Sequence, residues 1–268
     1  MNPELSQASK PAGAEPEPAP RNFFSRLIGV LFSPGETFAE IGHAKGAFGT
    51  ILAPILALVI IGATFGAVGT NRIGPENLKR AAEKQIQRMV DSGWIPQEKA
   101  AEALEQQNVS LAGAATWQAI TWALIYIVFA LIIAGIFKLV SAIMGWENRF
   151  KHLLSVTLYT SLAVGVVFYL IGFILLFLKN PDEIQLEILV GSNLGAVLTA
   201  MLDEGALSGY VKGLAMSVEV FAIWKIILLS IGFAAVSRKL KPATVGAVLG
   251  VLYVLIALVS APFFGMFS

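Results

Sequence analysis

The chain has 268 residues, of which 56% are hydrophobic and 14% are charged, and its net charge is +1. About 25% of the residues of a soluble domain are charged, and one water-soluble core of this length cannot bury so much apolar surface, so the composition excludes an ordinary soluble protein. The near-neutral charge supplies no basic surface for nucleic acid, and the absence of cysteine excludes disulfides, thiol catalysis and thiolate metal sites.

The N-terminal part divides into a polar tail and two short helices. Residues 1–20 are rich in Pro, Ala and Glu and lack the apolar core of a signal peptide, so we predict a disordered tail. Within residues 21–46, the apolar side chains from Phe23 to Leu31 share one helical face, and the sequence SPGE at residues 33–36 is typical of a helix start. The first helix is too short to span, so we predict that it lies at the bilayer surface; packing on the protein is the alternative.

Residues 47–266 contain five long apolar runs separated by polar loops. Each run reaches the roughly 20 residues that a 30 Å hydrocarbon layer requires. The runs are continuous rather than alternating, which favours helices over barrel strands. We therefore predict an all-α integral membrane protein, a bundle of about five transmembrane helices. The predicted spans are residues 48–69, 117–144, 153–178, 217–236 and 243–264.

Two of the loops are long enough to hold structure of their own. In residues 71–113, Pro75 opens a helical segment, Gly93 ends it and Pro96 opens a second one, so we predict a polar helical hairpin. Residues 184–202 are semi-apolar and are bracketed by acidic residues, which favours an interfacial or re-entrant helix. A sixth crossing is the alternative for this segment.

The charges of the short loops predict the orientation. The loops after the second and fourth spans are basic, and basic short loops remain in the cytoplasm. This places the N-terminus inside and the C-terminus outside. Residues 71–113 argue mildly the other way because they contain six basic residues, and the six acidic residues beside them count little in this rule. The basic residues of the two short loops are Arg149 and Lys151, and Arg238, Lys239 and Lys241.

Lys225 stands out because it lies inside the fourth predicted span. A lysine at the centre of a spanning helix costs about 2.5–3.5 kcal/mol on insertion scales, and Glu219, six residues earlier, lies on the wrong face to pair with it. Lys225 therefore contacts hydroxyl groups of neighbouring spans, reaches a lipid headgroup, or serves a ligand or transport pathway. The candidate hydroxyls belong to Tyr126, Tyr159, Tyr169 and Tyr253.

Other motifs indicate packing rather than chemistry. The Gly-x-x-x-Gly pairs Gly62/Gly66 and Gly246/Gly250 permit close helix contacts, within the protein or between two copies. Glu40 and His43 have the spacing of some metal ligands, but two ligands are too few, and we predict no metal and no cofactor. No zinc-protease motif, paired aspartates or phosphate-binding loop occurs in the sequence.

Several segments together resemble the bacterial members of the Yip1 domain family. They are LFSPGETF at residues 31–38, the Gln/Glu-rich loop after the first span, LLSV at residues 153–156 with Tyr159, and VFAIW at residues 220–224 with Leu228, Leu229, Gly232 and Phe233. The resemblance implies a five-helix membrane domain in a bacterial inner membrane, with a cytoplasmic N-terminus and no known catalysis. The Asp-Leu-Tyr-Gly-Pro motif of eukaryotic members is absent, so their small-GTPase binding is not carried over.

Two functions remain open at this point. The first is a non-enzymatic membrane organiser of the trafficking type, with the lipid bilayer and other membrane proteins or itself as partners. The second is a transporter or channel for a small solute or lipid that uses Lys225. An intramembrane enzyme is a distant third because the sequence contains none of the usual catalytic motifs.

Overall fold

The computed structural model describes residues 21–44, 46, 48–91, 93–111, 114–184, 189–202 and 208–266. These residues form helices and no strand, apart from one isolated antiparallel bridge between Asn193 and Glu219. The predicted all-α fold is confirmed. The tail predicted at residues 1–20 lies outside the described residues.

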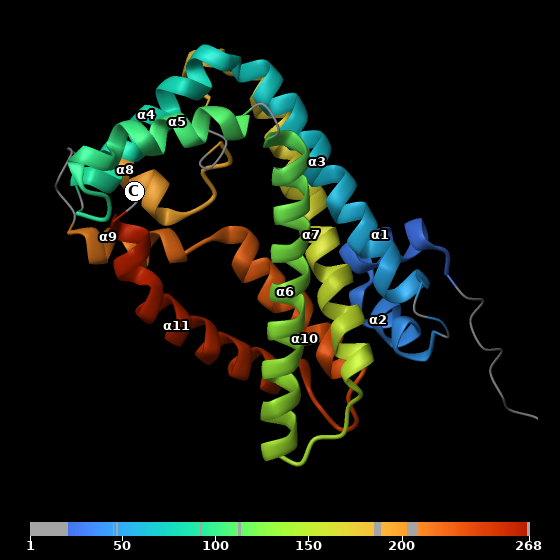
Figure 1. Ribbon diagram of the computed structural model, residues 1–268. Coiled ribbons are helices and arrows are strands. Elements are labelled where there is room, and N and C mark those ends of the chain that lie inside the picture. Colours follow the sequence, from blue (N-terminus) through green and yellow to red (C-terminus); the bar gives the residue numbers. More distant parts are fainter. Residues whose placement is uncertain are drawn as a thin grey trace, which may run out of the picture.

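Four helices in the described part are long and apolar enough to cross a membrane. Three of them, α3, α6 and α7, pack against one another, whereas α11 diverges from them and contacts α9 and α10 (Figure 1). A π-helical turn at Phe48–Leu52 leads directly into α3. The four helices are α3 (Ala53–Ile73), α6 (Ala114–Ile143), α7 (Phe150–Leu178) and α11 (Pro242–Met266).

The predicted number of about five spanning helices needs a correction. The segment expected at residues 217–236 is interrupted, and α9 (Gly209–Ser217) is separate from α10 (Val220–Ala235). Because α10 has 16 residues, it is about 24 Å long, which is less than the roughly 30 Å of the hydrocarbon core. The described chain thus combines four long helices with one shorter apolar helix.

The interruption has a local cause in the loop that precedes α8 (Leu194–Met201). The carbonyl of Val218 accepts a hydrogen bond from the Leu194 amide at 2.9 Å, and the amide of Val220 donates to the Ser192 carbonyl at 3.1 Å. These bonds hold the backbone between α9 and α10 in an extended form. With eight residues, α8 is too short for the alternative sixth crossing.

A helical hairpin follows α3, as the prolines and glycine of residues 71–113 predicted. Its helices are α4 (Pro75–Asp91) and α5 (Ala100–Leu111), with a short 3₁₀ turn at Gln97–Lys99 before α5. Ala82 and Ile86 are buried on the inner face of α4. The hairpin lies at one end of the bundle and extends over the side where α8 and α9 lie (Figure 1).

The two N-terminal helices belong to the core of the protein. They are α1 (Phe23–Phe32) and α2 (Pro34–His43), and both pack against α7, while α2 also contacts α10. Val30, Phe38 and Ile41 are fully buried in a cluster with side chains of α6, α7, α10 and α11. The opposite face of α1 exposes Phe24, Ile28 and Phe32. Thus α1 is apolar on its inner face and also on its outer face.

The basic loops meet at one end of the molecule. The loop after α6 and the loop after α10 are joined because the Arg238 amide donates to the Glu147 carbonyl at 3.1 Å. The two side chains also form an exposed ion pair at 3.3 Å. The α4–α5 hairpin lies at the other end (Figure 1). The structure therefore places the basic short loops and the α4–α5 hairpin at opposite ends of the bundle.

Candidate functional site

A buried ion pair connects the two N-terminal helices. Arg26 of α1 donates two hydrogen bonds to the Glu40 carboxylate of α2, from Nε at 2.9 Å and from an Nη at 2.7 Å. The side chains are only 9% and 12% exposed. Such a two-bond arrangement of guanidinium and carboxylate is among the strongest polar contacts in proteins. The hydrogen bonds that Arg26 donates to Glu40 raise the pKa of Arg26, although burial of the guanidinium works against this effect.

The pair also reaches the start of α3 and the middle of the core. The second Nη of Arg26 lies 3.5 Å from the carbonyl oxygen of Gly49, and the Tyr159 hydroxyl of α7 donates to the same oxygen at 2.6 Å. A side chain at position 49 would begin 3.2 Å from Arg26, so the glycine permits this close approach. Four segments, α1, α2, the π-helical turn and α7, are thereby joined by one polar cluster.

Local sequence explains why the two charges meet. Asn22 caps α1 because its side chain accepts from the Ser25 amide at 2.8 Å, and Ser33 with Pro34 turns the chain directly into α2. The buried Thr37, one turn before Glu40, donates to the Ser33 carbonyl at 2.9 Å. Glu40 therefore lies on the face of α2 that meets α1.

The sequence analysis did not identify this ion pair. The sequence pattern placed the apolar residues of α1 on one face, and Glu40 was considered only as a metal ligand with His43. In the structure, His43 is exposed and its Nδ1 lies 2.8 Å from the Ala39 carbonyl, while Glu40 binds Arg26. Among the described residues, no three His, Cys, Asp or Glu side chains form a group that could hold a metal ion.

Lys225 is half-buried on the side of α10 that faces α7. Phe221, one turn earlier, packs edge-on against Phe168 of α7 with ring centres 5.4 Å apart. Because α7 and α10 run in opposite directions, this contact places Lys225 level with Val164. No hydrogen bond or ion pair joins Lys225 to another described residue. One turn earlier in α7 than Val164, the buried Thr160 hydroxyl also has no partner among the described residues.

The tyrosines considered as partners of Lys225 form other hydrogen bonds. The hydroxyls of Tyr126 and Tyr169 bind each other at 2.9 Å and join α6 to α7. Tyr159 donates to the Gly49 carbonyl, and Tyr253 donates to the Ser217 carbonyl at 2.6 Å. These contacts stabilise the bundle and leave Lys225 without the hydroxyl contacts that the sequence suggested.

Glu219 lies at the interruption between α9 and α10 and caps α10. Its carboxylate accepts hydrogen bonds from the amides of Phe221 at 3.0 Å and Ala222 at 2.6 Å, and from the Ser192 hydroxyl at 2.6 Å. A negative charge is favourable at this position because the free amides and the helix dipole make a helix N-terminus positive. The first turn of α10 thus finds hydrogen-bond partners within the protein, as a membrane interior requires.

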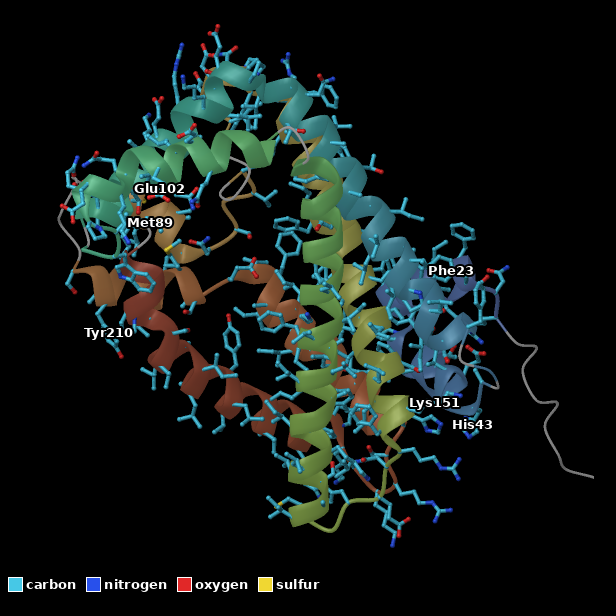
Figure 2. The ribbon with its side chains drawn as sticks, viewed as in Figure 1. Phe23, His43, Met89, Glu102, Lys151 and Tyr210 are labelled. Carbon is cyan, nitrogen blue, oxygen red and sulfur yellow. The ribbon has the colours of Figure 1, made fainter. Side chains whose placement is uncertain are left out.

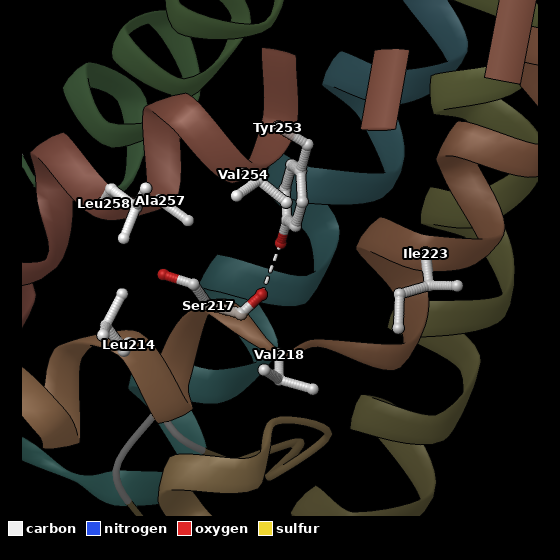
Figure 3. A pocket seen from close by; sticks show the side chains of 8 residues that line it. All are labelled: Leu214, Ser217, Val218, Ile223, Tyr253, Val254, Ala257 and Leu258. Atoms are coloured by element: carbon white, nitrogen blue, oxygen red, sulfur yellow. Dashed lines mark hydrogen bonds between the residues drawn. The ribbon is translucent and has the colours of Figure 1, made fainter. Parts of the chain in front are cut away.

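An open cavity of 260 Å³ adjoins this interruption (Figure 3). Its polar members are already engaged, since the Tyr253 hydroxyl binds the Ser217 carbonyl and the Ser217 hydroxyl donates to the Gly213 carbonyl at 3.1 Å. The other lining side chains are aliphatic, and Lys225 is not among them. The lining residues are Leu214, Ser217, Val218, Ile223, Tyr253, Val254, Ala257 and Leu258.

The glycines of the two Gly-x-x-x-Gly pairs have different surroundings. A Cβ atom at Gly62 would lie 3.3 Å from the Tyr169 hydroxyl, and one at Gly246 would lie 3.1 Å from the Ser230 hydroxyl. A Cβ atom at Gly250 would meet nothing within 4 Å, and the carbonyl of Gly66 accepts from the Thr70 hydroxyl at 2.9 Å. Close helix approach is therefore visible at the first glycine of each pair.

The family model of the Yip1 domain matches residues 28–261 of the chain, most of its length. The protein belongs to the Yip1 family. The Yip1 match begins just after Arg26 and includes Glu40, Tyr159 and Lys225. No curated protein and no solved structure matches the chain. The resemblance seen in the sequence is thus confirmed, and the protein is an integral membrane protein of this family.

Proposed function

We propose that this Yip1 protein is a non-enzymatic membrane organiser, which binds other membrane proteins or further copies of itself through its surfaces. The observation that carries the proposal is the buried pair of Arg26 and Glu40. The two charges neutralise each other and hold α1 and α2 against the bundle, so this pair has a structural role and presents no reactive group to a cavity. The outer surfaces of the packed bundle remain for contact with lipid and with protein partners.

Two surfaces are available for such contacts. The α4–α5 hairpin exposes charged side chains, including Lys79, Glu83 and Lys84, on its outer face. The long helices expose apolar side chains, such as Ile60 of α3 and Val259 of α11, where the lipid bilayer surrounds the protein. We infer that the glycines at positions 62, 66, 246 and 250 serve packing. We also infer that the basic loops face the cytoplasm of a bacterial inner membrane, with the C-terminus outside.

Cross-linking in native membranes tests the proposal. A photoreactive residue at Glu83 or Lys84 is expected to give discrete protein adducts that saturate with exposure. The same residue at Val259, which faces lipid, serves as the matched control and is expected to give lipid adducts. Only background adducts at Glu83 and Lys84, together with a protein that purifies alone from gentle detergent, would contradict an organising role.

The alternative of a transporter or channel rests on Lys225, which is half-buried and has no polar partner among the described residues. A transport pathway must let water reach this side chain. Cysteine at position 225, in a chain with no native cysteine, is then labelled by a membrane-impermeant thiol reagent from at least one side. Labelling together with Lys225-dependent solute flux would replace the organiser proposal, whereas protection from both sides removes the transport alternative.

A further inference from the structure

Four basic side chains gather where α2 ends and α7 begins. His43 is the last residue of α2, Arg149 caps α7, and Lys151 and His152 lie in its first turn. Arg149, Lys151 and His152 adjoin one another at the start of α7, and α2, which ends at His43, packs against α7. Figure 2 shows His43 and Lys151 at the same corner of the molecule. We call these four residues the basic corner.

Acidic side chains do not neutralise the basic corner. The ion pairs of the described residues involve Arg21, Arg26 and Arg238, and none includes a member of the corner. Glu147, two residues before Arg149, is paired with Arg238 of the neighbouring loop. His43, Arg149 and Lys151 are exposed and His152 is half-buried, so their polar ends remain available to an anion.

The surroundings of the basic corner are apolar in the direction of the bilayer. The membrane-spanning part of α7 starts at Phe150, which is 39% exposed. On α6, Leu139 is 67% exposed next to Lys138, whose Nζ donates to the carbonyl of Asn148, the residue before Arg149. A molecule that fits the basic corner and also the apolar side chains beside it has an anionic headgroup and acyl chains. A soluble anion would contact only the basic side chains.

We propose that the basic corner binds the headgroup of an anionic phospholipid. Arg149 and Lys151 contact the phosphate, His43 and His152 add hydrogen bonds, and the acyl chains lie against the ends of α6 and α7. A hydrogen bond from an ionised side chain to a phosphate contributes about tenfold or more in affinity, so loss of both Arg149 and Lys151 is expected to weaken binding by about tenfold or more. This inference does not depend on the proposed organising function.

The competing explanation is that these residues serve only to orient the chain, as basic loops generally do. In that case any two basic residues at this end contribute equally through long-range attraction. Lys239 and Lys241 of the loop between α10 and α11 provide the matched control, because they are exposed at the same end of the molecule and carry the same charge. They lie outside the basic corner.

Lipid binding to the full-length protein in detergent, measured by native mass spectrometry, distinguishes the explanations. Phosphatidylglycerol is expected to bind the unmodified protein more tightly than phosphatidylcholine does. The double variant Arg149→Gln/Lys151→Gln is expected to lose about tenfold or more in phosphatidylglycerol affinity, and Lys239→Gln/Lys241→Gln is expected to stay within about twofold. Equal losses in the two variants, or no loss in the first, overturn the proposal.

Two further measurements remove ambiguity from this result. Thermal unfolding of both double variants checks that the exposed substitutions leave the fold intact; if the first variant does not fold, His43→Gln/His152→Gln takes its place, with an expected loss of at least threefold. Glycerol phosphate, the soluble headgroup analogue, is added in a separate competition. Failure to displace the lipid supports a phospholipid site, whereas displacement at equal concentration shows a site for free anions and overturns the proposal.

Discussion

Replacing Arg26 with methionine tests whether the buried ion pair holds the N-terminal helices in place. The variant leaves the Glu40 carboxylate 12% exposed with its two charge-assisted hydrogen bonds broken. Removing one partner of a buried pair costs about 3–5 kcal/mol, and we expect about 3 kcal/mol because Glu40 retains some contact with solvent. For a chain of this length, about 3 kcal/mol corresponds to a fall in Tm of roughly 6–12 °C.

Thermal unfolding in detergent, followed by circular dichroism, measures this effect. Arg21→Met is the matched control, since Arg21 pairs with Glu36 across the same two helices but the side chains are 30% and 79% exposed. Exposed pairs contribute about 0.2–1 kcal/mol, so the control is expected to lower Tm by only a few degrees. If Arg26→Met lowers Tm by no more than the control Arg21→Met does, the assignment of the Arg26–Glu40 pair to the core is refuted.

The double variant Arg26→Met/Glu40→Met separates the cost of an orphaned charge from the value of the pair. Two apolar side chains of similar size often replace a buried ion pair without net loss. We therefore expect the double variant to recover at least half of the stability that Arg26→Met loses. If the loss in free energy of unfolding of the double variant equals the sum of the losses of the two single variants, the charges are not coupled and the reasoning fails.

Three further changes test the packing of α9, α10 and the long helices. Gly213→Ala places a Cβ against a backbone carbonyl of α11 and is expected to cost about 1–3 kcal/mol, whereas Gly250→Ala meets nothing within 4 Å and serves as the control in the same melting experiment. Glu219→Ala removes the cap of α10 and is expected to lower the free energy of unfolding by about 1–2 kcal/mol. Amide hydrogen exchange is expected to become faster only in the first turn of α10, and unchanged exchange would contradict the capping role of Glu219. Tyr126→Phe removes the hydrogen bond to Tyr169 and is expected to cost about 0.5–1.5 kcal/mol by denaturant titration, and no change would indicate that the bond does not form in the membrane.

The spanning helices could be predicted because their signal is a property of each segment alone. A run of about 20 apolar residues has few alternatives to a membrane helix, and the turn residues Pro75, Gly93 and Pro96 likewise mark the α4–α5 hairpin without reference to other parts of the chain. These features required no knowledge of which helices become neighbours.

The interruption at Val218 and the ion pair could not be predicted in this way. Residues 217–236 are apolar enough for a span, and only the backbone bonds to Ser192 and Leu194 divide them into two helices. Arg26 and Glu40 are 14 residues apart, and their pairing depends on the turn at Ser33. In both cases the deciding contact lies between segments that are separate in the sequence.

The short helix α10 and the N-terminal helices fit together as parts of one membrane unit. A helix of about 24 Å cannot cross the hydrocarbon layer alone, so its two ends need protection by protein. Glu219, bound to Ser192, satisfies the first end. Near the other end, Gly232 lies so close to Phe38 of α2 that a Cβ atom would be 2.9 Å from the ring.

This packing changes the view of where the membrane domain begins. The Yip1 match starts at residue 28, inside α1, and the buried pair fixes α1 and α2 against the helices that follow. We therefore infer that the N-terminal helices fold with the bundle, so that the unit begins before the boundary predicted at residue 47. Their outer face still carries the exposed stripe of Phe24, Ile28 and Phe32, which is suited to the bilayer interface. Packing on the protein uses only the inner face of α1, so it is compatible with the predicted position at the bilayer surface.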